Sequence, residues 1–283
     1  MIKHKFVCGE PDFPVTVTFT QPAAIADFHV QPRRPLVILL PGGGYRFYSD
    51  RENEIVALQY LAQGFAVAVV QYRLVTNPPV LPTALIQLGM VVAEFHRHAA
   101  VYGISPDHIL VAGFSAGGHL AALYADLWPL LSWDCHVATS NLKIAALALA
   151  YPVIGLRLGW PTDEATRVAI TAKWPAHEAD QLVTPQNPPT FIWTTADDET
   201  VPADNTERYT AALQRNGVPV TSKLYPHGPH GLSLARAVTA FPRKSASTGE
   251  QFIRPDVAEW FTNEMAWLDH LWHLNEFWLN QGG

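Results

Sequence analysis

The sequence predicts an α/β protein in which a mostly parallel sheet is covered on both faces by helices. Short apolar runs alternate along the chain with longer segments of helical periodicity. Several of these runs are apolar throughout, as is typical of strands buried on both faces. The 283 residues are 48% hydrophobic and 16% charged, which is enough for one large core. We therefore expect one domain over residues 1–283 and no disordered chain.

Three apolar runs predict buried strands, at 36–40, 65–70 and 109–112, and three further runs predict strands, at 144–150, 190–194 and 220–225. Five segments of helical character predict the helices. The helices are expected at 52–63, 84–102, 120–127, 206–216 and 255–278. Residues 5–20 are richer in β-branched types and are expected to add antiparallel strands at an edge of the sheet.

Two segments interrupt this alternation. Residues 152–186 separate two strands by more than a plain crossover needs, and we interpret them as a small insertion that helps to roof a pocket. Residues 240–252 are rich in Ser, Thr, Lys and Arg and are expected to form an exposed loop. Neither segment has the composition of a linker between two domains.

Charge and hydropathy narrow the range of partners. The formal net charge is −6, so the chain has no excess of basic residues, which argues against a nucleic-acid partner. No run of about 18 apolar residues occurs, so no membrane span is expected. The first residues lack the pattern of a secretion signal. Cys8 and Cys135 are therefore expected to be free thiols in a cytoplasmic protein.

One motif suggests a nucleophile. Gly113-x-Ser115-x-Gly117 follows a predicted strand and opens a predicted helix. In this context the motif is typical of a nucleophile elbow, a sharp turn that presents a serine hydroxyl at the carboxyl edge of the sheet. Small residues on either side let the chain segments pass closely, and Ala116 can offer its N–H to an oxyanion. The same pattern in isolation would be only a glycine-rich turn.

A serine nucleophile needs a base and an acid that orients the base. An acidic run, 197–199, follows the strand that ends near Thr194, and two histidines, His227 and His230, follow the last strand. Both loops are expected at the same sheet edge as Ser115. From spacing alone the acid is Asp197, Asp198 or Glu199, and the base is His227 or His230.

A glycine run supplies the remaining part of a serine hydrolase site. Pro41-Gly42-Gly43-Gly44-Tyr45 follows the first buried strand. Glycines allow the main chain to approach a substrate closely, and backbone N–H groups there can stabilise an oxyanion. Without a GK[ST] ending, the run is not a phosphate-binding loop.

With these motifs in place, the chain resembles the acetyl esterase and hormone-sensitive-lipase-like branch of the α/β-hydrolases. It is most similar there to bacterial esterases grouped with acetylxylan-esterase-like and feruloyl-esterase-like domains. The resemblance runs from about Leu36 to Trp272 and is carried by the glycine run, the Ser115 motif and the acid and histidine loops. It implies the α/β-hydrolase fold, no cofactor, and hydrolysis of a small ester with a short acyl group such as acetyl, on a sugar or a small alcohol.

The resemblance also selects among the open alternatives. In the family the acid stands three residues before a Val-Pro pair, which implies Asp198, and the base is the histidine just before the second glycine of the histidine loop, which implies His230. The implied oxyanion donors are Gly43 or Gly44 together with Ala116. The chain departs from many lipase-like relatives in having Pro41 where they have His, which affects the substrate class more than the activity.

Three residues near these motifs are candidates for substrate contacts: Tyr45, His119 and Trp160. No metal-ligand spacing such as CxxC or HExxH occurs, so we expect no metal. The aromatic stripe of the last helix is expected to be core, and an excess of exposed aromatics there would indicate a homo-oligomer contact. The competing functions are an amidase or peptidase of the same fold and a non-catalytic binding protein.

Overall fold

One eight-stranded sheet organises the molecule, in the order β1-β2-β4-β3-β5-β6-β7-β8. The computed structural model describes residues 1–28, 32–172, 174–242 and 249–282. The strands are β1 (Ile2–Cys8), β2 (Val15–Gln21), β3 (Arg34–Leu40), β4 (Ala66–Gln71), β5 (Ile104–Phe114), β6 (Ala146–Ala150), β7 (Thr190–Thr195) and β8 (Val220–Tyr225). Strands β3 to β8 pair in parallel, whereas β2 pairs antiparallel with both β1 and β4. This arrangement is the α/β-hydrolase fold, and it confirms the predicted class and the antiparallel edge.

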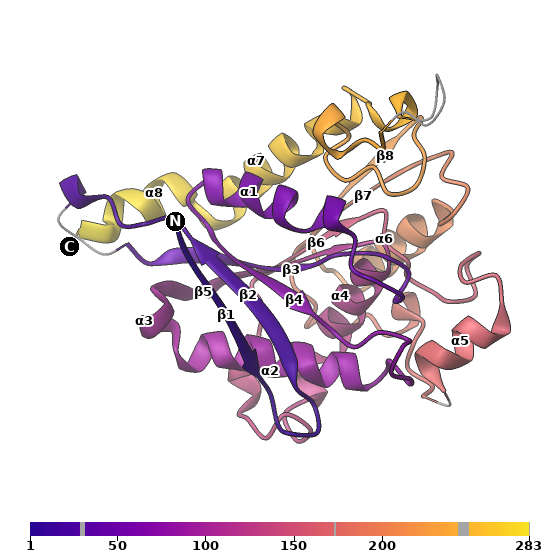
Figure 1. The fold of residues 1–283 in the computed structure, drawn as a ribbon, viewed down its shortest axis with the longest axis horizontal. Helices are drawn as coiled ribbons and strands as arrows, with labels where there is room; N and C mark the ends of the chain where they lie inside the picture. The colour runs from indigo at the N-terminus through magenta and orange to yellow at the C-terminus, as the bar shows by residue number, and fades with distance from the viewer. Residues whose placement is uncertain (29–31, 173, 243–248, 283) are drawn as a thin grey trace.

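Helices cover both faces of this sheet (Figure 1). They are α1 (Glu54–Ala62), α2 (Thr83–Arg97), α3 (Ala99–Tyr102), α4 (Ala116–Leu127), α5 (Glu164–Thr171), α6 (Asp204–Arg215), α7 (Trp260–Trp272) and α8 (Leu274–Leu279). The apolar run of β3 has no polar alternation because both faces of this strand are covered by helices. Leu36, Ile38 and Leu40 pack with α2 and α4, whereas Val37 and Leu39 pack with α1 and α7.

Two of the predicted helices are divided. The helix expected at 84–102 ends at Arg97, and α3 follows after His98. The last helix begins at Trp260 rather than Pro255, and a left-handed His273 (φ 50°) separates α7 from α8. Three side chains of α7 are buried in the core: Trp260, Phe261 and Leu268. The aromatic stripe is therefore core, as predicted.

The segment expected to be an exposed loop, 240–252, is only partly one. Phe252 is buried, and its ring packs edge-on against that of Phe241 at 4.9 Å. The Arg51 guanidinium stacks on both rings, so the ends of this segment are anchored to the molecule. Residues 243–248 lie outside the described part of the chain.

Cys8 and Cys135 both carry free thiols. Among the described residues, no helix has the length and apolar character needed to cross a bilayer. The cytoplasmic location and the partners expected from the sequence stay predictions.

Candidate active site

The turn between β5 and α4 presents Ser115 at the carboxyl edge of the sheet. Ser115 has left-handed backbone geometry (φ 52°, ψ −117°), which a serine adopts only when its surroundings enforce it. The turn is tight because Gly117 passes directly over the end of β3. A Cβ at Gly117 would lie 2.6 Å from the carbonyl oxygen of Pro41. The glycine of the motif is thus required by close approach of two backbones.

Ser115, His230 and Asp198 form one hydrogen-bonded chain. Ser115 Oγ lies 2.8 Å from His230 Nε2, and His230 Nδ1 lies 2.7 Å from Asp198 Oδ2. Because a carboxylate can only accept, Nδ1 carries the proton and Nε2 of the neutral ring accepts from the serine hydroxyl. The structure therefore gives the histidine the tautomer that a general base needs.

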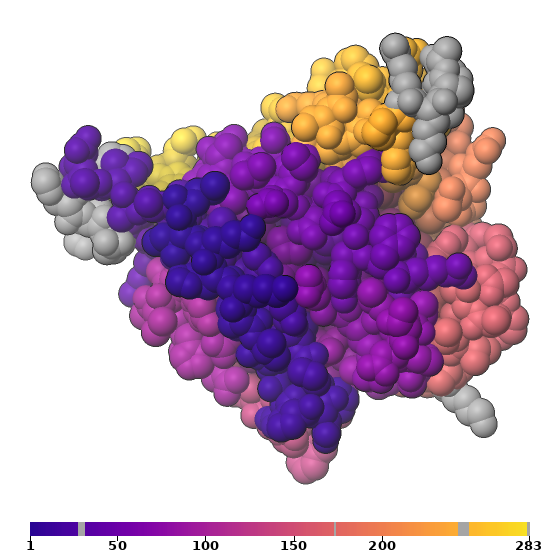
Figure 2. All heavy atoms as spheres, in the orientation of Figure 1, coloured from indigo at the N-terminus to yellow at the C-terminus, as the bar shows by residue number. Residues whose placement is uncertain are grey.

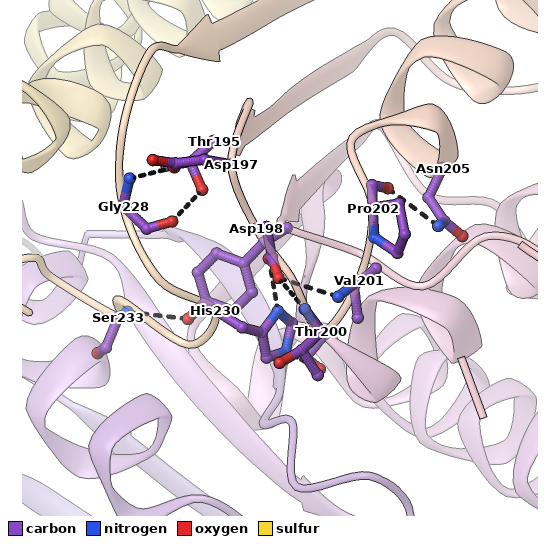
Figure 3. A network of polar contacts seen from close by, with 12 residues as sticks. Thr195, Asp197, Asp198, Thr200, Val201, Pro202, Asn205, Gly228, His230 and Ser233 are labelled. Atoms are coloured by element: carbon purple, nitrogen blue, oxygen red, sulfur yellow. Dashed lines mark hydrogen bonds and ion pairs between the residues drawn. The ribbon is translucent and has the colours of Figure 1, made fainter. Parts of the chain in front are cut away.

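Asp198, the acid of this hydrogen-bonded series, is held in place by its own loop. Asp198 is 5% exposed, and its second oxygen accepts hydrogen bonds of 2.9 Å from the backbone N–H groups of Thr200 and Val201. Figure 3 shows these bonds converging on the carboxylate next to the His230 ring. Both carboxylate oxygens are thus engaged, and these contacts orient the carboxylate toward the base.

The two residues that rival Asp198 and His230 in the sequence form a separate pair. Asp197 Oδ2 lies 3.0 Å from His227 Nδ1, and Asp197 Oδ1 accepts a 2.6 Å bond from the Gly228 N–H. That N–H, assisted by His227, lowers the pKa of the Asp197 carboxyl. Thr195 also donates to the Gly228 carbonyl at 2.6 Å. These contacts tie the acid loop to the histidine loop (Figure 3).

The glycine run leaves β3 beside the serine. Gly43 (φ 122°) and Gly44 (φ 62°) adopt conformations that favour glycine, and both line a cavity together with Ser115. Ala116 is the first residue of α4, where the orphan N–H groups and the helix dipole favour negative charge. Gly43 and Gly44 thus share the cavity with Ser115, and Ala116 follows the serine directly in the chain; their role as oxyanion donors stays a prediction.

A cavity of about 700 Å³ opens over Ser115 and His230. One wall comes from Gly43 and Gly44 of the glycine run and from the stretch between Arg46 and Glu52. The opposite wall comes from the insertion, which contributes Trp160 to Asp163 and Thr166 of α5. Phe241 closes part of the rim. The insertion does help to form the pocket, as predicted from its length, although its second tryptophan, Trp174, packs against the core instead.

Two of the three predicted substrate contacts are wrong. Tyr45 and His119 are fully buried beneath the glycine run and do not line the cavity. His119 Nε2 donates to the His177 carbonyl at 2.9 Å, and Nδ1 accepts from the Tyr45 hydroxyl at 3.0 Å. Burial lowers the pKa of His119 to about 4, so the ring is neutral at pH 7. The hydrogen bond between Tyr45 and His119 therefore anchors the end of the glycine run to α4. Only Trp160 lies in the cavity wall.

Sequence reasoning missed the charged residues of the cavity wall, among them Arg51 and Glu52. Glu52 is 3% exposed, and its two oxygens accept from the Gly42 N–H at 2.8 Å and the Tyr151 hydroxyl at 2.7 Å. A glutamate at the start of a predicted helix is usually solvated, so the sequence carried no local sign of this burial. Within the described ranges, no group of three or more His, Cys, Asp or Glu side chains is arranged to hold a metal.

Residues 25–213 match the family model described as BD-FAE. The chain belongs to the BD-FAE family. The carboxylesterase Cest-2923 from Lactobacillus plantarum WCFS1 has a similar structure, with a TM-score of 0.89 and 33% identity over 95% of this chain and 98% of that one. This similarity extends over more of the chain than the BD-FAE region does.

Two longer proteins contain a region similar to this BD-FAE chain. Endo-1,4-beta-xylanase B of Butyrivibrio fibrisolvens is 27% identical over 217 residues, which are 72% of this chain. An acetylxylan esterase of Xylanibacter ruminicola is 28% identical over 223 residues, also 72% of this chain. The chain spans only 33% of the first protein and 42% of the second.

Proposed function

We propose that this protein is a serine carboxylesterase that hydrolyses short-chain, acetyl-like esters through an acyl-enzyme. The observation that carries the proposal is the hydrogen-bonded series from Ser115 through His230 to Asp198, at 2.8 and 2.7 Å, at the floor of an open cavity. Serine is a weak nucleophile by itself, and a base in this tautomer supplies the activation.

In the first half-reaction, His230 Nε2 takes the proton of Ser115 as Oγ attacks the ester carbonyl. Negative charge develops on the carbonyl oxygen and is stabilised by the N–H groups of Gly43 or Gly44 and of Ala116. Asp198 stabilises the imidazolium that forms. His230 then protonates the departing alcohol, which leaves the acyl group on Ser115.

In the second half-reaction, water replaces the alcohol. His230 takes a proton from the water as its oxygen attacks the acyl-enzyme carbonyl, and the same N–H groups stabilise the second oxyanion. The tetrahedral intermediate collapses, Ser115 Oγ leaves with the proton from His230, and the free acid is released. The chain's own residues perform every step.

The size of the acyl group is inferred from the cavity and from the family. Trp160 stands against the glycine run, since a Cβ at Gly44 would lie 3.3 Å from the Trp160 ring. A bulky ring this close to the proposed oxyanion site favours a small acyl group. The similarity to an acetylxylan esterase and to a carboxylesterase supports the same substrate class.

A fluorophosphonate probe and a pair of chromogenic substrates test the proposal. The folded protein should form a covalent adduct on Ser115 and hydrolyse p-nitrophenyl acetate, and the Ser115→Ala variant should do neither. A folded parent protein that remains unlabelled would refute the hydrolase proposal and favour a binding protein. Faster turnover of a matched p-nitroanilide than of the ester would favour an amidase.

A further inference from the structure

Glu52 lies between two loops that the proposed reaction needs, although it belongs to neither. Its Oε2 accepts from the Gly42 N–H at 2.8 Å, directly before the proposed oxyanion donors. Its Oε1 accepts from the Tyr151 hydroxyl at 2.7 Å, in the turn after β6. A Cβ at Gly42 would lie 2.6 Å from Glu52 Oε2 and 2.9 Å from Ser115 Cβ, so carboxylate, glycine run and nucleophile are in close contact.

Tyr151 extends this connection to the histidine loop. Its hydroxyl accepts a 2.9 Å bond from the Ser233 N–H, three residues after His230. Its ring packs edge-on against the His230 ring with centroids 5.2 Å apart. Ser233 is held from the other side by Trp260, whose indole N–H donates to the Ser233 carbonyl at 2.9 Å. The Ser233 hydroxyl donates to the Arg51 carbonyl, one residue before Glu52.

The bonding pattern connects Glu52 to the loops on both of its sides. Both of its partners are donors: the Gly42 N–H, and the Tyr151 hydroxyl, which already accepts from Ser233. Burial, with Glu52 beside it, raises the pKa of Tyr151 well above its ordinary value, so the hydroxyl keeps its proton. Both oxygens of Glu52 are therefore occupied as acceptors, and a buried carboxylate held in this way resists displacement.

The Gly42 bond has a consequence for the oxyanion. Because the Gly42 N–H donates to Glu52, it is engaged away from the substrate, and the orientation of the Pro41–Gly42 peptide at the start of the run is fixed. Gly43 and Gly44 adopt positive φ angles, and glycines are conformationally free. The hydrogen bond between Gly42 and Glu52 limits that freedom at the start of the run. Donors that are fixed before the reaction need no reorganisation when charge develops.

The geometry points to Glu52 as a positioning residue that holds the oxyanion run and the histidine loop in a fixed relation through Gly42 and Tyr151. This inference rests on the proposed function. Glu52 touches none of the reacting atoms and acts through the two groups it binds. Its effect is therefore on the chemical step and not on ground-state binding of the ester.

Two variants test it, each with a matched control. Glu52→Gln keeps the volume of the side chain but loses one of its two acceptors, and Tyr151→Phe keeps the ring against His230 but loses both hydroxyl bonds. The controls are Glu264→Gln and Tyr60→Phe, which alter the buried 2.7 Å bond between Tyr60 and Glu264, two residues that do not line the cavity.

We expect kcat for p-nitrophenyl acetate to fall about 10- to 100-fold in Glu52→Gln and about 10-fold in Tyr151→Phe, with KM within about threefold of the parent value. A trifluoromethyl ketone, whose adduct with Ser115 places an oxyanion in the same position, should lose affinity by the same factor as kcat/KM. Both controls should retain activity within about twofold. The double variant should lose less than the product of the two single losses, because the residues act as one unit.

Parent-like kcat in both folded variants would overturn the inference. The inference would also be overturned if the loss of activity in each variant equalled its loss of folded protein, measured by thermal melting, while the folded protein bound the inhibitor normally. If Glu52→Gln does not fold, Tyr151→Phe decides by the same criteria. Failure of the proposed function is distinguishable, because then the parent itself neither hydrolyses esters nor labels at Ser115.

Discussion

The carboxylate of Asp197 lies 3.0 Å from Nδ1 of His227. The two residues that compete with Asp198 and His230 for the catalytic assignment are therefore engaged with each other. Their side chains are 53% and 68% exposed, whereas those of Asp198 and His230 are 0% and 18% exposed. Only the buried pair reaches the hydroxyl of Ser115, and this difference makes the assignment testable.

We expect the two pairs to respond very differently to truncation. Asp198→Ala and His230→Ala should each lower kcat by at least about 10³-fold, because they remove the orienting acid and the base. Asp197→Ala and His227→Ala should remain within about 10-fold of the parent, since their contacts only tie the two loops together. Steady-state hydrolysis of p-nitrophenyl acetate measures this. Activity of His230→Ala comparable to that of His227→Ala would reverse the assignment.

Trp160 should limit the length of the acyl group. Trp160→Ala removes the ring that stands against Gly44, and the cavity enlarges next to the proposed oxyanion donors. We expect kcat/KM to fall for the acetyl ester and to rise by about 10-fold or more for hexanoyl or octanoyl esters relative to acetyl. A series of p-nitrophenyl esters from two to eight carbons measures the profile. Trp174→Ala is the control, and an unchanged profile in Trp160→Ala would contradict the role.

The buried Glu264 should make the protein less stable as the pH rises. Burial raises its pKa from 4.5 to about 8, and the Tyr60 hydrogen bond opposes this. The raised folded-state pKa means that the native protein keeps a proton that the unfolded chain releases above pH 4.5. The stabilisation is thus complete below pH 4.5 and is lost as the pH rises through about 8.

Glu264→Gln removes this proton linkage while keeping an acceptor for Tyr60. Relative to the parent, the variant should gain unfolding free energy between pH 4.5 and pH 9, on the order of 4 kcal/mol. Urea unfolding of both proteins at the two pH values measures the change. A difference between parent and variant that is the same at both pH values would show that Glu264 does not titrate in this way.

Two glycines should respond to alanine for different reasons. In Gly117→Ala the new methyl group would collide with the backbone carbonyls of Leu40 and Pro41, so we expect a loss of at least about 3 kcal/mol or no folding. At Gly217 (φ 71°) nothing lies within 4 Å of a new Cβ, so Gly217→Ala costs only the left-handed conformation, about 1 kcal/mol. Thermal melting compares them, and equal losses would contradict the distinction.

The central strand β3 was predictable because its apolar pattern is complete within the strand. Leu36 to Leu40 are apolar at every position, and the two helical layers explain why both faces of the strand are buried. The positions of Ser115 and of the acid and histidine loops follow from strand ends meeting at one edge. The choice of Asp198 over Asp197 needed the family resemblance, since adjacent carboxylates have the same local pattern.

The residues missed or misplaced depend on tertiary contacts. Tyr45 sits next to the glycine run, but its own left-handed geometry (φ 57°) accompanies a side chain that is buried in the core. Glu52 precedes a helix and resembles an ordinary N-terminal acid. Its partners lie 10 residues before it and 99 residues after it, and no spacing in the sequence encodes that pairing.

The sheet order also bears on how the protein could be attached to a solid support. The cavity is lined by residues from 43 onward, and no described residue of β1 or β2 is among them. These two strands form one edge of the sheet, and Figure 2 shows them in indigo at the surface, away from the segment that contains α5. A linker at the N-terminus should therefore leave the mouth of the cavity open to solvent. An immobilised catalyst made in this way should keep the turnover of the free protein.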